Sequence, residues 1–349
     1  MSKNIESISE FLIHAGTQYL LFDMGRCVRP IDNQAFLSIE NGQIQAPYPR
    51  QQHFWCGVVY WNKNLSAQRY IWFIKLPVDE QGCVVDAARQ HFLEKILTAL
   101  TSSQSDNSID LAQTEQNSSN PYIYQPNQQQ LADFNAQTRK RIGLLPCDDY
   151  QLALNYLKAP YIQDWRDISL QGLADVVAFA PEDQLTAILT SVKSLPATVR
   201  QHLLSSLENV ALSQQQVNSI VNDIEWQSDH SDNSLTYQLR ALSQMPNESQ
   251  RQQIISKILN HTNALTRDIL VVIAGRHWLG LHGKNMLRFL EIAADLDTDL
   301  HSFSFFCSLF ADIAQLPQIR NEALKALREP ERSSRLSDAI GALFKRNPS

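Results

Sequence analysis

The chain has 349 residues, a hydrophobic content of 44%, a charged content of 19% and a formal net charge of −6. These values are typical of a globular protein large enough for two domains, and the negative balance argues against broad, nonspecific binding of nucleic acid. The five cysteines are scattered and form no CxxC pair, so we predict neither a disulfide framework nor a zinc knuckle. No other metal site and no cofactor are predicted.

The first sixteen residues lack the basic start and the apolar core of a secretory signal. The most apolar run, residues 269–275, is far shorter than the roughly 18 to 20 residues of a membrane span. We therefore expect a cytoplasmic protein without a membrane-bound segment.

Residues 1–100 are predicted to form a small α+β domain, with an antiparallel sheet and helices. Ser7, followed three residues later by Glu10, has the spacing of a capping box. The other elements follow from turn residues, aromatic runs and apolar periodicity. We expect helices over residues 7–16, 32–42 and 84–100, a strand over 18–24, and a hairpin of strands over 53–61 and 69–76.

The run over residues 53–61 is aromatic and β-branched, and alternation puts four of its apolar side chains on one face: Phe54, Cys56, Val58 and Tyr60. The other face is apolar too, which favours a strand covered on both sides by helices and the linker over a platform for stacked bases. His53 and Cys56 point to opposite faces, so we predict no nucleophilic pair there.

Residues 101–130 are rich in Ser, Asn and Gln, and they contain no basic residue. This composition predicts a polar linker between two domains. Its aromatic pair, Tyr122 and Tyr124, can dock on either neighbour, so part of the linker is expected to be ordered.

Residues 131–349 are predicted to form an all-α, HEAT-like helical-repeat domain. Proline, then arginine, then apolar residues at +3, +4 and +7 recur three times, and Arg267 repeats the offsets without the proline. The irregular distances between the copies predict degenerate helical hairpins. The arginines of the three copies are Arg200, Arg251 and Arg320, and the last copy, residues 317–331, resembles a HEAT-type repeat helix.

A charged turn follows the first predicted strand, with acidic and basic side chains around Gly25. It is either a small anion site or partner-binding loop, or a turn that local Asp–Arg pairs hold in place. Arg50 and His53 can join it if the strands are adjacent. The candidate binding surface is therefore Asp23, Arg26, Arg29, Arg50 and His53, and no catalytic residue is predicted.

Two further motifs have simple interpretations. Gly280, Gly283 and Lys284 lack the GxxxxGK[ST] spacing of a phosphate loop, so they predict a turn and a helix that begins near Lys284. The segment over residues 319–346 is locally basic. It is either a solvated helix face or a surface that binds an acidic protein or RNA.

Three segments resemble the hallmark of an uncharacterised proteobacterial family, catalogued as a domain of unknown function (DUF3549). They are FLIHAGTQYLLFDMGRCVRPIDNQAF, PYPRQQHFW and YIWFIKLPVDEQG, at residues 11–36, 47–55 and 70–82. The resemblance extends over most of the chain. It implies a cytoplasmic bacterial protein and brings no catalytic residues with it.

Three functions stay open, in this order of preference. The first is a non-catalytic scaffold that holds a protein partner on the helical-repeat surface. The second is an RNA-associated adaptor that uses the basic C-terminal segment or the arginines of the charged turn. The third is an unrecognised enzyme with a pocket between the two domains.

Overall fold

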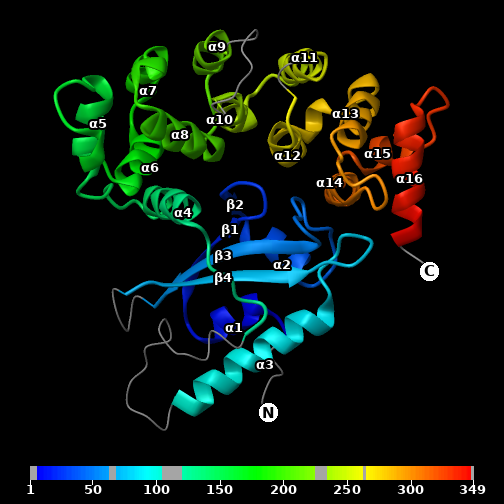
Figure 1. Cartoon of the computed structure of the whole chain (residues 1–349). Coiled ribbons are helices and arrows are strands. Elements are labelled where there is room, and N and C mark those ends of the chain that lie inside the picture. The colour runs from blue at the N-terminus through cyan, green and yellow to red at the C-terminus, as the bar shows by residue number, and fades with distance from the viewer. Residues whose placement is uncertain (1–5, 63–67, 104–119, 225–233, 262–264, 347–349) are drawn as a thin grey trace. The chain divides into compact units, whose positions relative to one another are not determined.

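The computed structural model describes residues 6–62, 68–103, 120–224, 234–261 and 265–346. The chain divides into two compact units, Met1–Asn127 and Gln128–Ser349 (Figure 1). The first unit contains a four-stranded antiparallel sheet with helices, and the second consists of helices, which confirms the predicted fold class. Among the described residues, no helix is both long and apolar enough to cross a membrane.

The sheet has the strand order β2-β1-β3-β4, with antiparallel pairing throughout. Three strands lie within one residue of their predicted bounds, whereas β2 was not predicted. The register pairs Asp23 of β1 with Cys56 of β3, so the ends of both strands meet at the charged turn. The bounds are β1 (Gln18–Asp23), β2 (Arg29–Ile31), β3 (His53–Trp61) and β4 (Tyr70–Pro77).

Helices α1 (Ile8–His14), α2 (Asn33–Glu40) and α3 (Asp86–Ser103) share one apolar core with the sheet. The strand residues of this core include all four that alternation placed on one face, so that prediction is confirmed. The buried side chains of the core include Ile8, Leu12, Phe36, Ile39, Phe54, Cys56, Val58, Ile74, Phe92 and Leu93.

The start of α1 is capped from two directions. The Ser7 hydroxyl accepts a hydrogen bond from the Glu10 backbone N–H, as the capping-box spacing predicts. Glu10 does not return the bond to Ser7; it accepts instead from the N–H of Glu6. The buried Glu40 carboxylate of α2 accepts from the N–H groups of Ile8 and Ser9, at 2.7 and 3.1 Å, and so joins the two helices.

Part of the predicted linker pairs with the exposed edge of β4. The Lys75 N–H donates to the Tyr122 carbonyl at 2.8 Å, and the Tyr124 N–H donates to the Phe73 carbonyl at 3.1 Å. The Tyr124 ring then packs edge-on against Trp55, at 4.7 Å between centroids. This segment covers an edge that would otherwise be open to pairing. Residues 104–119 of the predicted linker lie outside the described residues.

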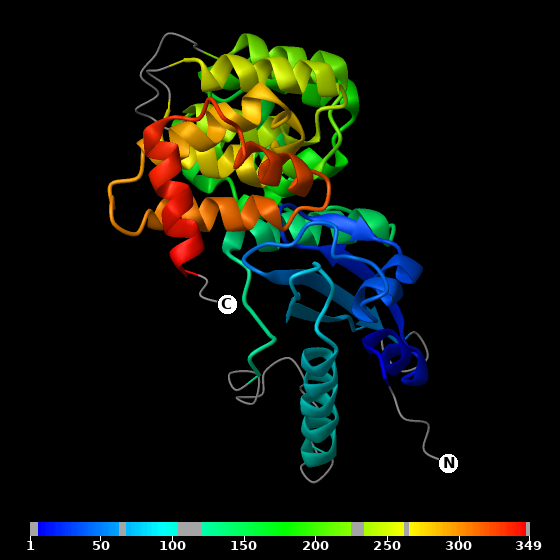
Figure 2. The same cartoon turned by 90° about the vertical axis from the view of Figure 1, so that its right-hand side faces the viewer.

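The second unit is built from helices in two layers, which Figure 1 shows as an arc. In one layer α4, α6, α8, α10, α12 and α14 follow each other, and the other layer contains α5, α7, α9, α11 and α13. Figure 2 shows α16 at the C-terminal end of the arc, against α13 and α14. The bounds are α4 (Gln128–Arg141), α5 (Tyr150–Lys158), α6 (Leu170–Phe179), α7 (Glu182–Thr190), α8 (Ala197–Ser206), α9 (Gln214–Asn222), α10 (Ser234–Ala241), α11 (Glu248–Leu259), α12 (Arg267–Arg276), α13 (Lys284–Asp295), α14 (Ser304–Ala314), α15 (Arg320–Ala326) and α16 (Ser334–Arg346).

The recurring arginine pattern marks helices α8, α11, α12 and α15, and most of its apolar residues are buried. Two are not: Val271 and Leu324 are 50% and 40% exposed. The arginine itself has a structural use in α11, where buried Arg251 donates to the carbonyls of Ser243 and Met245 at 3.0 and 2.8 Å. It thereby satisfies carbonyls that have no helical partner at the end of the preceding turn.

Candidate functional site

The charged turn lies at the end of the sheet where β1 stops and β3 starts. Two loops, residues 24–28 and 46–52, pack closely here because Gly25 lacks a side chain: a Cβ on it would lie 2.3 Å from the Tyr48 carbonyl oxygen. The Arg26 guanidinium joins the same loops, with Nε and Nη2 at 3.1 and 2.8 Å from the Pro49 carbonyl oxygen. Gly25 therefore allows the two loops to approach closely, and the hydrogen bonds of Arg26 to Pro49 connect them.

Asp23 sits beneath these loops and is almost fully buried. Its Oδ1 accepts from the Gly25 N–H at 2.9 Å, whereas Oδ2 accepts no hydrogen bond from the described residues. Burial raises the pKa of this carboxyl to about 7, although the charges of Arg29, Arg26 and Arg50 act to lower it. The carboxyl can therefore take up a proton near neutral pH.

Two arginines of the predicted surface stack on aromatic rings. The Arg29 guanidinium lies 4.3 Å from the centre of the Tyr48 ring, and that of Arg50 lies 4.2 Å from the Trp55 ring. The Trp55 indole N–H donates to the Arg50 carbonyl at 2.8 Å. The structure thus brings Asp23, Arg26, Arg29 and Arg50 to one end of the sheet, and a binding role for them stays a prediction.

His53 and Asp32 have local tasks. Nδ1 of His53 donates to the Gln51 carbonyl, 2.7 Å away, within the turn that precedes β3. Asp32 is the N-cap of α2, because its Oδ1 accepts from the N–H groups of Gln34 and Ala35. Neither residue needs a ligand to explain its position.

The turn from Arg50 to His53 gives a first testable prediction. Gln51 and Gln52 both have positive φ, +51° and +60°, as the central residues of a two-residue type I′ turn do. Asn-Gly fits this backbone with less strain, so the double change Gln51→Asn, Gln52→Gly is expected to raise the free energy of unfolding by about 1 kcal/mol. Urea unfolding of the full chain measures it, with Gln51→Ala, Gln52→Ala as the control. A loss of stability would show instead that the glutamine side chains hold the turn.

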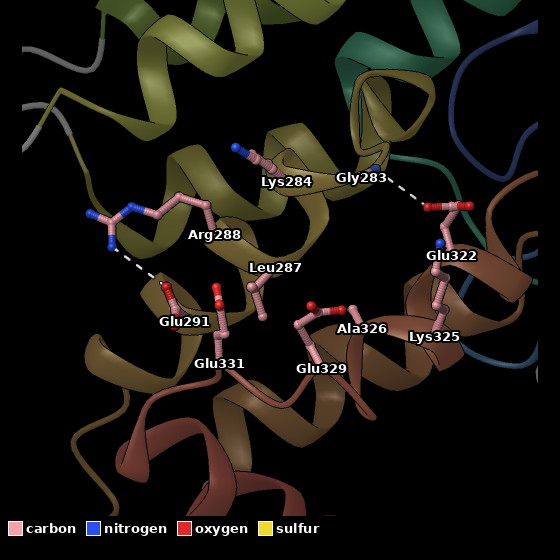
Figure 3. Close-up of a pocket in the computed structure, with 10 residues that line it drawn as sticks. All are labelled: Gly283, Lys284, Leu287, Arg288, Glu291, Glu322, Lys325, Ala326, Glu329 and Glu331. Atoms are coloured by element: carbon pink, nitrogen blue, oxygen red, sulfur yellow. Dashed lines mark hydrogen bonds and ion pairs between the residues drawn. The ribbon is translucent and has the colours of Figure 1, made fainter.

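A second site is a groove between α13 and α15, with a volume of about 390 Å³ (Figure 3). Each helix contributes one stripe of side chains at offsets of 3, 4 and 7, which is the spacing of a single helix face. The stripe of α15 continues into the turn after that helix, and Gly283 and Glu331 complete the lining. The stripe of α13 is Lys284, Leu287, Arg288 and Glu291, and that of α15 with the following turn is Glu322, Lys325, Ala326 and Glu329.

Carboxylates hold the two ends of this groove. Glu322 accepts from the Gly283 N–H, and Glu291 accepts from the Ser333 N–H, both at 3.3 Å. Glu291 also lies 3.9 Å from the Arg288 guanidinium. Each bond joins one wall of the groove to the other wall or to the segment that follows it. The two helix stripes are therefore set in place without a ligand.

Four other charged side chains of the groove do not connect its walls. The carboxylates of Glu329 and Glu331 and the amines of Lys284 and Lys325 form no hydrogen bond or ion pair with the described residues. Glu329 is half-buried, and the other three are exposed. Leu287 and the buried Ala326 give the groove an apolar part between these charges. The arrangement offers both charge signs and an apolar contact to a ligand.

The model of a family described as a protein of unknown function, DUF3549, matches residues 3–344. The chain belongs to this family. No curated protein and no solved structure matches it. In this DUF3549 protein, the three segments that carried the resemblance lie in the first unit. They contain the end of α1, β1, β2, the start of α2, the turn before β3 with the first residues of that strand, and β4.

The basic C-terminal segment of this family member is partly occupied by structural bonds. Arg332 donates to the Leu327 carbonyl at 3.0 Å, and Arg335 donates to the carbonyls of Ala294 and Asp297 at 2.9 and 2.8 Å. Both guanidiniums thus satisfy backbone groups at helix ends. These two arginines offer less to an acidic partner than the sequence indicates.

Proposed function

We propose that this DUF3549 protein is a non-catalytic protein-interaction scaffold, and that the groove between α13 and α15 holds its partner. We place it in the bacterial cytoplasm. The observation that supports this function is a preformed groove in which charged groups of both signs have no partner among the residues that the structure describes. A site that is already in position loses little entropy when a partner binds.

The shape of the helical unit supports the same function. Helices stacked in two layers present successive faces along an arc, and such arrays use extended surfaces to bind other proteins. The groove lies near the end of the arc, between helices of its last hairpins. A partner seated there contacts two elements whose relative position is fixed.

A photo-crosslinking experiment in cells tests this function. The crosslinker p-benzoylphenylalanine replaces Leu287 inside the groove or, as the matched control, Leu324, which is 40% exposed on α15 but does not line the groove. We expect a discrete protein adduct from position 287 that withstands nuclease and is missing from position 324. Equal adducts at both positions would contradict the proposal. An adduct that nuclease removes would favour the RNA-associated adaptor.

A further inference from the structure

Two adjacent apolar side chains project from the loop between α5 and α6. Tyr161 and Ile162 are 86% and 81% exposed, and Leu145, at 83%, is the one other large apolar residue of the described chain that is exposed to this degree. Single apolar side chains are common on protein surfaces, whereas neighbouring ones mark places where another molecule makes contact. The pair at the tip of this loop is therefore a candidate contact surface.

The loop is held in shape by its own hydrogen bonds. The Ile162 N–H donates to the Ala159 carbonyl at 3.2 Å, and the Asp164 carboxylate accepts from the backbone N–H and the guanidinium of Arg166 at 2.9 and 3.0 Å. These bonds fix the loop, yet Tyr161 and Ile162 stay uncovered by the described residues. A partner thus meets a preformed surface and loses little entropy in ordering it.

The charges of the loop differ before and after the apolar pair. Lys158 lies before the pair, at the end of α5. After the pair come two carboxylates, Asp164 and Asp167, and one guanidinium, Arg166, which is paired with Asp164. Lys158 and Asp167 are both exposed, and their side chains form no hydrogen bond or ion pair within the part of the chain that the structure describes. The loop therefore offers a cation on one side of its apolar tip and an anion on the other.

A second copy of the chain complements this arrangement. In a contact with two-fold symmetry, the same patch faces itself in the opposite direction. The cationic side of one loop then meets the anionic side of the other, and this happens twice, while the two apolar tips cover each other. A partner that carries one sign of charge would leave one side of the loop unmatched.

We propose that two copies of the chain associate through the loop between α5 and α6. Tyr161 and Ile162 of each copy pack against the same pair of the other copy, and Lys158 of each pairs with Asp167 of the other. Four large apolar side chains make a small interface, so the dimer is weak and forms at micromolar concentrations.

The dimer extends the proposed scaffold function but does not depend on the groove. The loop belongs to the first helices of the arc and the groove to the last ones (Figure 1). A pair of chains joined at their first helices keeps both grooves uncovered, so the assembly can hold two partner molecules at once.

Sedimentation equilibrium of the full chain tests the proposal. We expect the average mass of the wild type to rise with concentration towards that of two chains. The double variant Tyr161→Ser, Ile162→Ser should weaken the dimer at least about tenfold, whereas Leu145→Ser, in the loop at the other end of α5, should leave it unchanged. A wild type that stays monomeric up to about 1 mM would overturn the inference. A mass that continues to rise beyond two chains, or equal weakening by both variants, would do the same.

Charge reversal tests the two-fold arrangement. Lys158→Glu and Asp167→Lys should each weaken the dimer, because each gives both sides of the loop the same sign of charge. An equimolar mixture of the two variants should dimerise as the wild type does, since one loop is then anionic and the other cationic. No recovery in the mixture would show that Lys158 and Asp167 do not face each other.

A crosslinker in cells identifies the molecule that covers the loop. With p-benzoylphenylalanine in place of Tyr161, we expect an adduct with the mass of two chains, in which mass spectrometry finds a second copy of this protein. An adduct with a different protein in its place would overturn the inference and leave the scaffold function standing.

Discussion

Replacing Glu208 by alanine is expected to lower the free energy of unfolding of the helical unit by about 3 to 5 kcal/mol. Glu208 follows α8 and is buried, and two arginines clamp it. Arg240 of α10 donates to both carboxylate oxygens at 3.0 and 2.9 Å, and Arg276 of α12 donates at 2.8 and 3.3 Å. These charges hold the pKa of Glu208 below its ordinary value despite its burial. Without the carboxylate, two partly buried guanidiniums face each other unpaired.

Thermal and urea unfolding of the full chain measure this loss, and for a unit of this size it corresponds to a fall in Tm of about 10 °C or more. Glu208→Gln keeps the shape of the side chain and removes only its charge, so it separates the cavity from the electrostatics. Glu331→Ala is the matched control, since that exposed carboxylate has no partner among the described residues. A Glu208→Ala variant as stable as the control would show that the clamp does not stabilise the arc.

The strands of the first unit could be predicted from the sequence where their pattern is local. The aromatic and β-branched run of β3 begins at His53 and ends at Trp61 in the structure, as alternation predicts. The strand β2 has only three residues and contains Pro30, which removes a backbone donor and breaks any strand pattern. Its pairing with β1 depends on tertiary contacts that no short window of sequence contains.

The charged turn was within reach of sequence reasoning, but the groove was not. Asp23 ends β1 and Arg50 lies just before β3, and the two residues meet because these strands are neighbours, an adjacency on which the prediction for Arg50 depended. The stripes of α13 and α15 come from segments separated by a whole helix, α14. Taken alone, each stripe mixes charges like any solvated helix face, so only their meeting in the fold reveals a groove.

Contacts between buried polar side chains could not be predicted from the sequence either. His277 has no metal-ligand spacing in the sequence, and in the structure it is buried: Nε2 donates to the Leu239 carbonyl at 2.7 Å, and Nδ1 accepts from Arg251 at 3.3 Å. Arg251 was singled out as part of a repeat, and its contact with His277 could not be foreseen. The two residues are 26 positions apart, and α11 and the turn after α12 bring them together.

Burial and the nearby Arg251 lower the pKa of His277 to about 3, which sets its effect on stability. Below pH 6.5 the unfolded chain binds a proton at this histidine and the folded chain does not, so stability falls as the pH falls. Asp133 of α4 acts in the opposite direction. Burial raises its pKa to about 7, so the folded chain binds the proton first, and stability rises as the pH falls from 7 towards 3.8.

The two effects oppose each other in the helical unit, and single variants should reveal them. Between pH 6.5 and pH 5, His277→Gln is expected to gain stability relative to the wild type by up to about 1.4 kcal/mol per pH unit as the pH falls. Asp133→Asn is expected to lose stability with the same slope. Urea unfolding of the full chain at several pH values measures both slopes, and the contributions of the other titrating groups to stability cancel when each variant is compared with the wild type.

Parallel pH profiles for the two variants would mean that these side chains titrate as they do in the unfolded chain. Opposite slopes would establish that the helical unit keeps a neutral histidine and a protonated carboxyl in its core at pH 6, because burial disfavours the charged form of each.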